Sequence, residues 1–481
     1  MSEGGEIPIS NLIVVGPSSV EGDIRAGQYY ILDLNTMKQV VGTSEEVTDE
    51  YKEYLGPIRW NITAGGNIAS MDSGSGTEGS VSISGSGNFT IAATVIGNSA
   101  SKTASATYYI TDYYISSFAD LQELERIINA SSEATIQLTK NSQSSYSPTN
   151  GGGLSGAHLR LTNDIDCLNS HVQIGRYRSE SDYIPFKGKF DGAGYSIFNI
   201  GGTITFPSGY SGTGIASFLF DSGYQARFFN FHVSGTITKA IGRNGCFGVT
   251  LYSYLNRISS NMTTDKTQAQ GSPNGQAQFY SLLSYSSYGT IEDILQLDTI
   301  YASRVVGISL WSKEHSVRRC FTRNYIYINS TAAYTNLGLA SPSGENSLLE
   351  DNVCFDSLTN LRNTVESIPS CLLYAMNSSS TTDTAKNSYT VKTGGNFGQT
   401  TAWVIRKSTR NPTIQNCFYD SDKTRFSRQS DEGATAKTTQ QMKSGNLFSN
   451  DNNAWIQVAG YYPLLNNQYA VHPKVLESIR Y

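Results

Sequence analysis

The sequence predicts an all-β protein in which a β-sandwich precedes a longer β-solenoid. Three observations support this: a composition rich in small polar and aromatic residues, short apolar segments between turn residues in the first 114 positions, and a four-residue pattern that recurs between positions 228 and 417. Charged residues are only 16 % of the 481 residues, whereas 45 are Gly and 30 are Tyr. Strands favour aromatic residues and tight turns favour Gly, so this composition is typical of short strands joined by turns.

The charge balance and the absence of long apolar segments argue against two kinds of partner. Lys and Arg number 35 and Asp and Glu number 40, which gives a formal net charge of −5. No basic block could neutralise nucleic-acid phosphates, and no segment of about 18 apolar residues could cross a membrane. The first residues lack the basic and apolar regions of a secretory signal. We expect no nucleic-acid partner, no membrane insertion, and either export by another route or a leader that was removed.

Residues 1–114 are predicted to form a single β-sandwich, because short apolar runs alternate with turn clusters at the spacing of small all-β domains. The strand that begins at Val81 alternates apolar and polar residues, and the segment Gly85–Asn88 is predicted to connect it to the next strand as a hairpin. Trp60 is expected in the core. The predicted strands lie at 12–15, 29–34, 58–62, 81–83, 89–96 and 107–110.

A short helix is predicted to begin at Ser117, with Asp120 three residues later as in a capping box. Apolar residues then recur every three or four positions and form one stripe, which must pack on a neighbouring element. Because a β-rich region follows, we expect residues 115–157 to comprise this capping helix and a loop. The stripe consists of Phe118, Leu121, Leu124, Ile127 and Ile128.

One pattern of four residues (apolar, any residue, Asn/Asp/Arg, apolar) predicts the solenoid. Its copies begin at 228, 255, 291, 317 and 414, and a looser copy begins at Leu349. The first four of these five regular copies are 27, 36 and 26 residues apart, and the last gap is 97. Such periods indicate a repeated supersecondary unit that buries its inner face only by stacking on its neighbours.

Motifs at both ends of this region resemble those of right-handed β-helix domains with GLUG-type repeats. The resemblance covers residues 115–466 and implies a right-handed parallel β-helix over 158–466, followed by a tail at 467–481. In this family the residues Asp191, Gly192 and Gly194 form a structural turn. The matching segments are 158–166, 172–175, 186–197, 416–420, 437–442 and 454–465.

Residues 1–114 also resemble a bacterial immunoglobulin-like domain of the group 2 type, on the segments 16–20, 60–63 and 79–94. The Cys…Trp…Cys pattern of antibody domains is absent. The resemblance implies a docking or spacer domain next to the β-helix.

Carboxylates in equivalent positions of two repeats suggest glycoside cleavage, since glycosidases use paired carboxyl groups about 5–9.5 Å apart. Between these two repeats lies a third with two arginines in the same positions, which favours a ladder of salt bridges instead. No residue is therefore predicted to be catalytic. The residues of this stack are Glu292, Asp293, Arg318, Arg319, Glu350 and Asp351.

Metal and cofactor sites are not predicted. The five His residues are scattered without metal-ligand spacing, and no Gly-rich loop opens a helix. The six Cys residues are too sparse for a disulfide scaffold and suit the role of small buried residues. A stacked pair of Cys320 and Cys354 is the alternative left open.

Tyrosines in and beside the middle repeats are the candidate glycan-binding residues, because ring faces can stack on sugars. The alternative is that they cover the edges of the repeats. The candidates are Tyr252, Tyr254, Tyr280, Tyr285, Tyr288, Tyr325 and Tyr327.

Together these features predict a non-enzymatic, surface-displayed structural or adhesive protein. We expect a phage virion component, such as a head or tail fibre, spike or decoration protein, that binds surface polysaccharide and other virion proteins as a homo-oligomer. The alternatives are a secreted bacterial cell-surface adhesin and a β-helix polysaccharide depolymerase.

Overall fold

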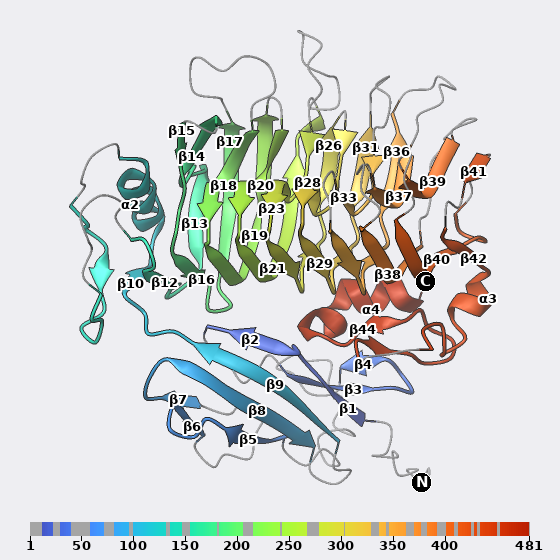
Figure 1. Cartoon of the computed structure of the whole chain (residues 1–481), viewed down its shortest axis with the longest axis horizontal. Helices are drawn as coiled ribbons and strands as arrows, with labels where there is room; N and C mark the ends of the chain where they lie inside the picture. Colours follow the sequence, from blue (N-terminus) through green and yellow to red (C-terminus); the bar gives the residue numbers. More distant parts are fainter. Residues whose placement is uncertain are drawn as a thin grey trace, which may run out of the picture. The chain divides into compact units, whose positions relative to one another are not determined.

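The computed structural model comprises two compact units, each built mainly from strands (Figure 1). One unit contains Met1–Ile110 and Met442–Tyr481, and the other contains Thr111–Gln441. The second unit is therefore inserted in sequence between two parts of the first. The structure describes residues 12–22, 29–39, 58–71, 81–95, 100–130, 135–146, 154–179, 182–204, 215–240, 243–266, 279–302, 304–328, 336–342, 346–361, 370–376, 382–391, 401–407, 412–424, 428–430, 433–449 and 453–480.

The N-terminal part of the first unit is made of small, mainly antiparallel sheets. One sheet has the order β1-β3-β4, a second has the order β2-β9-β8-β5, and β6 pairs with β7. The strands are β1 (Leu12–Val15), β2 (Ser19–Glu21), β3 (Tyr30–Asp33), β4 (Lys38–Gln39), β5 (Ile58–Ala64), β6 (Ala69–Met71), β7 (Val81–Ile83), β8 (Gly87–Val95) and β9 (Ser101–Tyr108).

These sheets share one core. Side chains from β1, β3, β5, β8 and β9 belong to the same buried cluster, in which the Trp60 ring lies 5.2 Å from that of Tyr29. Trp60 is a core residue, as predicted. The predicted hairpin across Gly85–Asn88 is wrong: β7 pairs with β6, whereas β8 pairs with β5 and β9. The Gly-rich segment connects strands of two different sheets.

The C-terminal part of the first unit contains β43 (Trp455–Ile456), β44 (Leu464–Leu465), the 3-10 helix η4 (Gln468–Val471) and α4 (Pro473–Arg480). It is bonded to the N-terminal part. Lys102 Nζ donates to the backbone and side-chain oxygens of Asn466 at 2.8 and 2.7 Å, and Arg480 Nη2 donates to the Met37 carbonyl at 2.7 Å. Of the segments predicted to close the β-helix, 454–465 thus belongs to the compact unit of the first sheets, as does the predicted tail, whereas 416–420 belongs to the second unit.

The second unit contains the predicted helix, α2 (Phe118–Asn129), after its first strand, and the short α3 (Thr439–Met442) lies at the boundary where this unit ends. The Ser117 hydroxyl accepts a hydrogen bond from the Asp120 backbone N–H at 3.2 Å. The Asp120 carboxylate accepts one from the Ser116 backbone N–H at 2.8 Å. The apolar stripe is buried in the core of the unit, and α2 lies at the N-terminal end of the strand stack (Figure 1). Asn129 Nδ2 also donates to the Gln173 carbonyl at 2.8 Å.

The larger of two extended sheets in this unit has 20 strands among the described residues, and all its pairings are parallel except β10–β11. Its strands are β10 (Tyr113–Ile115), β11 (Thr139–Lys140), β12 (His158–Leu161), β13 (Ile165–Ser170), β16 (Lys189–Asp191), β17 (Ser196–Ile204), β19 (Arg227–Ala240), β21 (Tyr254–Thr264), β24 (Thr290–Glu292), β25 (Leu295–Gln296), β26 (Thr299–Ala302), β29 (Ser316–Arg318), β30 (Phe321–Thr322), β31 (Tyr325–Ile328), β34 (Leu348–Glu350), β35 (Val353–Cys354), β36 (Ser357–Asn360), β38 (Thr384–Thr390), β40 (Thr413–Asp420) and β42 (Thr435–Lys437).

The other extended sheet has 11 described strands, all in parallel pairs. A separate hairpin joins β14 (Arg176–Ser179) to β15 (Asp182–Ile184). The 11 strands are β18 (Ile215–Tyr224), β20 (Arg243–Leu251), β22 (Phe279–Tyr280), β23 (Leu283–Ser287), β27 (Arg304–Val305), β28 (Ser309–Lys313), β32 (Asn336–Leu337), β33 (Ala340–Pro342), β37 (Ser370–Met376), β39 (Thr401–Lys407) and β41 (Arg428–Ser430).

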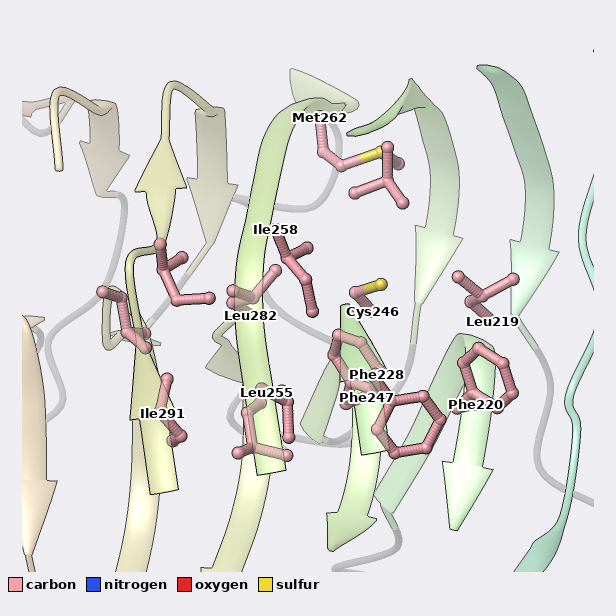
Figure 2. Close-up of a cluster of buried hydrophobic side chains, with 14 of the residues drawn as sticks. Leu219, Phe220, Phe228, Cys246, Phe247, Leu255, Ile258, Met262, Leu282 and Ile291 are labelled. Carbon is pink, nitrogen blue, oxygen red and sulfur yellow. The ribbon is translucent and has the colours of Figure 1, made fainter. Parts of the chain in front are cut away.

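Strands of one repeat pair in register with the same strands of the next repeat, and we call each such repeat a coil. Strands β24, β25 and β26 pair with β29, β30 and β31, which pair in turn with β34, β35 and β36. Side chains from both extended sheets fill one continuous core. Figure 2 shows its aromatic centre, where the Phe220 and Phe228 rings lie 4.6 Å apart and Phe247 packs against both.

Candidate functional site

The recurring four-residue pattern marks one corner of each coil. Its third residue has a positive φ in every copy, a backbone conformation that Asn and Asp adopt more readily than other non-Gly residues. The structure adds a copy that begins at Ala385, within the longest gap between the predicted copies. The corner residues, with φ in parentheses, are Asn230 (64°), Arg257 (52°), Asp293 (55°), Arg319 (50°), Asp351 (54°), Asn387 (48°) and Asn416 (49°).

Next to these corners, charges alternate along one column of paired residues: Glu292, Arg318, Glu350 and Lys386. Lys386 Nζ lies 2.7 Å from Glu350 Oε1, and Arg318 Nε lies 3.6 Å from Glu350 Oε2. The predicted ladder of salt bridges is confirmed.

The strongest ion pair of this ladder involves Arg319. Its guanidinium donates to both oxygens of Asp293 at 2.8 and 2.9 Å and to Glu292 at 2.9 Å. Burial alone would lower the pKa of Arg319, but the charges of Asp293 and Glu292 raise it above its ordinary value. Glu292 also accepts from the Tyr254 hydroxyl. Arg319 therefore binds Glu292 and Asp293, one of the two carboxylate pairs that were considered for glycoside cleavage.

Three of the seven candidate tyrosines are bonded to other groups of the protein and are buried or partly buried. Tyr280 is 1 % exposed and donates to Asp298 at 2.9 Å, so its ring is not on the surface and cannot contact a glycan in this conformation. Tyr254 is partly buried, donates to Glu292, and has the Arg227 guanidinium 5.4 Å from its ring centre. Tyr285 is also partly buried and accepts from the Ser287 hydroxyl at 3.1 Å.

Tyr252 and Tyr288 are exposed, at 50 % and 44 %, but they cover each other. Their rings are parallel within 8° with centres 4.7 Å apart, and Tyr224 contacts Tyr252 in an edge arrangement at 5.7 Å. Two rings at that separation leave no room for a sugar between them.

Tyr325 differs from the other candidates. It is 46 % exposed, and no ring or cation of the described residues packs against it. It pairs with Thr299 on one side and Ser357 on the other, so its neighbours along the column have short side chains. The ring is thus exposed between two short side chains, and the flanking hydroxyls of Thr299 and Ser357 have no hydrogen-bond partner among the described residues.

The second residue on this surface is Tyr327, two positions along β31 and on the same face. Its ring stacks at 4.5 Å on Tyr301, which the sequence analysis missed. Tyr301 pairs with Tyr327, and Tyr327 pairs with Thr359. Only the register of the coils reveals this neighbour, because the two rings are 26 positions apart.

These residues belong to two outward-facing columns, which we call the β31 strip. One column passes through Tyr325 and the other through Tyr327. The strip crosses five strands that pair in the order β19, β21, β26, β31 and β36. The columns are Thr236, Thr263, Thr299, Tyr325 and Ser357, and Tyr301, Tyr327 and Thr359.

The predicted turn at Asp191 is held by hydrogen bonds to the Asp191 carboxylate. The carboxylate accepts from the Ala193 backbone at 2.8 Å and from Asn230 Nδ2 at 3.1 Å. Gly194 has φ +80°, and a Cβ on Gly192 would meet that of Phe231 at 2.2 Å. Both glycines are thus required by geometry, and Asp191 is committed to the turn.

The cysteines of the described part of the chain are buried and are not in disulfide bonds: Cys167, Cys246, Cys320, Cys354 and Cys417. Cys320 and Cys354 do not stack, because Cys354 pairs with Thr322 and Asn352 lies opposite Cys320. Burial raises the pKa of Cys167 to about 12, so this thiol is unreactive. The alternative of a stacked Cys320–Cys354 pair is wrong.

Two further buried groups titrate away from their ordinary values. Burial raises the pKa of Asp221 to about 7, although backbone N–H groups of Tyr177 and Ser217 donate to it at 2.9 and 3.3 Å. Burial lowers the pKa of His315 to about 3, and its Nδ1 lies 3.3 Å from the Ser347 hydroxyl. Neither group is near the β31 strip in the coil register.

Comparisons with known proteins supply no relative: no family model matches the chain, and no curated protein matches it. Within the described residues, no group of three or more His, Cys, Asp or Glu side chains could hold a metal ion. No described helix is long and apolar enough to span a membrane.

Proposed function

We propose that this protein binds glycans without cleaving them, through the β31 strip. The observation that carries the proposal is Tyr325, an exposed aromatic ring that lies between two short hydroxyl side chains. Aromatic rings offer a large rigid contact surface, and hydroxyl groups orient a ligand by hydrogen bonds. This combination suits the apolar and polar faces of a sugar ring.

We infer that the strand stack is a right-handed parallel β-helix and that the first sheets form an immunoglobulin-like sandwich. The in-register parallel pairing of successive coils supports the first inference, since parallel crossover connections are overwhelmingly right-handed. The shared core of two small sheets supports the second. The assignment to GLUG-type repeats rests on the sequence motifs.

We also propose that the protein is displayed on a virion, as a head or tail fibre, spike or decoration protein, with the sandwich as its docking module and a homo-oligomer as its assembled form. The rigid stack and its unengaged outward face suit display. Mass spectrometry of purified phage particles that carry the gene tests this placement. Recovery of the chain on a bacterial envelope instead would support the cell-surface adhesin.

The alternative of a polysaccharide depolymerase is less well supported. Glu292 and Glu350 are separated by Arg318, and two strand spacings put them about 10 Å apart. Arg319 and Tyr254 already occupy the Glu292 oxygens. Glu350 is likewise paired with Lys386 and Arg318, so both acids are engaged within the protein.

The test is a binding screen of the full chain against extracted bacterial capsular and surface polysaccharides, with reducing ends measured in the same samples. Tyr325→Ala should weaken binding at least about tenfold, or about 1.4 kcal/mol. The matched control is Tyr252→Ala, since Tyr252 is equally exposed but its ring is stacked; its affinity should equal wild type.

Two results would overturn the proposal: no binding by the wild-type chain, or equal affinity of the Tyr325→Ala variant. Release of reducing ends that is lost in Glu292→Gln or Glu350→Gln would identify a depolymerase instead.

A further inference from the structure

A second corner recurs in the coils, after strands of the 11-stranded sheet, and it also places its residues in left-handed backbone. Strands β23 and β28 pair before this corner and β24 and β29 pair after it, both with a spacing of 26 positions. Tyr288 and Glu314 lie between these strands with the same spacing, so they occupy equivalent places in neighbouring coils. The corner residues, all exposed, with φ in parentheses, are Gln225 (51°), Tyr252 (53°), Tyr288 (55°), Glu314 (45°) and Asn346 (57°).

Two tyrosines occupy adjacent places in this row of corners. The Tyr252 and Tyr288 rings are parallel within 8° with centres 4.7 Å apart, close to the strand spacing of about 4.8 Å, so they stack along the coil axis. Tyr288 is 44 % exposed, and Tyr252 is the only ring among the described residues that contacts it. The next place along the axis belongs to Glu314. The stack therefore ends at an aromatic ring whose neighbour in the next coil carries a carboxylate.

The Glu314 carboxylate is not engaged within the described part of the protein. Its side chain is exposed, and it forms no ion pair or hydrogen bond with the described residues. The carboxylates at the first corner differ, because Arg319 binds both Glu292 and Asp293. The second corner thus presents an anion that is free to pair with a cation from outside.

Tyrosine is also an unusual residue for left-handed backbone, which disfavours bulky side chains. Tyr252 and Tyr288 both adopt it, and they share a single stacking contact that offsets only part of the cost at two positions. Residues held in such backbone conformations cluster at functional sites. This observation supports a use for the exposed ring stack beyond the stability of the coils.

We infer that this surface binds the guanidinium of an arginine side chain on a partner protein, stacked on Tyr288 and paired with Glu314. A guanidinium is planar and donates from its edge, so it can extend a stack of rings while it bonds a carboxylate. Both halves of this contact already occur in the chain. The Arg227 guanidinium lies 5.4 Å from the Tyr254 ring centre, and Arg319 donates to both oxygens of a carboxylate. Tyrosine and arginine also dominate the binding energy of protein interfaces.

The test is chromatography of the full chain at low salt on two resins. Agmatine-agarose presents a guanidinium on an alkyl chain, and cadaverine-agarose presents an ammonium. Wild type should be retained longer on the guanidinium resin. Glu314→Gln and Tyr288→Ala should each lower the retention factor about threefold, as expected for loss of an exposed ion pair or cation–π contact. Tyr288→Phe should keep the wild-type value, because the ring remains.

The matched control is Glu477→Gln, which removes the same charge from an exposed glutamate of α4. It should elute as wild type does. Equal losses in Glu314→Gln and Glu477→Gln would reduce the retention to net charge and overturn the inference. Equal retention of the wild-type chain on both resins, or no effect of Tyr288→Ala, would also overturn it.

Competition distinguishes a protein partner from a small molecule. The blocked peptide N-acetyl-Gly-Arg-Gly-amide should displace the chain from the guanidinium resin at a lower concentration than free arginine, because Glu314 repels the carboxylate of the free amino acid. The reverse order would contradict a protein partner and indicate a site for free arginine.

Discussion

The Arg319 guanidinium forms a bidentate ion pair with the Asp293 carboxylate of the preceding coil, with Nε 2.8 Å from Oδ1 and Nη2 2.9 Å from Oδ2. Both residues have left-handed backbone at equivalent corners, so the pair joins two positions that the four-residue pattern marks. The Asp293 side chain is fully buried, and that of Arg319 is 16 % exposed. This ion pair is therefore shielded from water, unlike most surface pairs.

Removing the guanidinium should be costly. Arg319→Met leaves the carboxylates of Asp293 and Glu292 without their cation, and breaking a buried pair from one side costs about 3–5 kcal/mol of unfolding free energy. The urea midpoint measures the loss. Arg318→Met is the control, because that side chain is 39 % exposed and its ion pair at 3.6 Å should contribute less than about 1 kcal/mol. Equal midpoints for the two variants would contradict this account.

The corner conformation can be tested at Asn416, which is exposed and has φ 49°. Asn416→Val places a β-branched side chain in left-handed backbone, which costs roughly 1–2 kcal/mol, whereas Asn416→Gly carries no such penalty. Both variants lose the same hydrogen bond to Asn387 Oδ1. We expect Val to unfold at lower urea concentration than Gly. The opposite order would show that the corner does not constrain the residue type.

The phenylalanine cluster of Figure 2 should be sensitive to volume. Phe220 is fully buried and contacts the rings of Phe228, Phe190 and Phe247. Phe220→Ala should lower the free energy of unfolding by about 3–5 kcal/mol through lost burial and the cavity that remains. Phe220→Leu keeps more of the volume and should cost clearly less, and thermal denaturation of both variants gives the comparison. A similar loss for both would argue that ring packing, not volume, dominates.

Asp221 and His315 should give stability opposite dependences on pH. Folding raises the pKa of Asp221 from 3.8 to about 7, so between these values the folded state holds a proton that the unfolded chain releases, and stability falls as pH rises. Folding lowers the pKa of His315 from 6.5 to about 3, so the unfolded chain binds the extra proton and stability rises with pH. Between about pH 4 and 6.5 the two slopes oppose each other.

Single substitutions should separate these slopes. In Asp221→Asn the free energy of unfolding should rise from pH 4.5 to 6.5, by up to about 1.4 kcal/mol per pH unit, and in His315→Asn it should fall by a similar amount. Urea midpoints at three pH values measure both. Parallel pH profiles for wild type and the two variants would show that neither group keeps its shifted pKa.

Local features of the fold were predictable where a single residue constrains the backbone. The strand Val81–Ile83 and the helix from Phe118 follow from alternation and from a stripe with a capping serine. The corner pattern was visible because left-handed backbone restricts the third residue. The copy at Ala385 was missed because its fourth residue is Ser388, a polar side chain that the pattern excludes.

The candidate surface was less predictable because it depends on register. Ile291 pairs with Val317, 26 residues on, Val317 with Leu349, 32 residues on, and Leu349 with Ala385, 36 residues on. Unequal coils hide which residues become neighbours, so Tyr301 and Tyr327 could not be matched from spacing. Exposure was equally hidden: Tyr280 and Tyr325 look alike in sequence, but one hydroxyl is bonded to a buried carboxylate and the other ring faces water.

The insertion of Thr111–Gln441 between two parts of the first unit has a mechanical consequence. A force applied between β1 and α4 pulls on two segments of the same unit, which is held together by bonds such as those of Lys102 to Asn466 and of Arg480 to Met37. The intervening coils carry no load until those bonds rupture. As long as those bonds hold, the first unit bears the applied force and the β31 strip is not under tension.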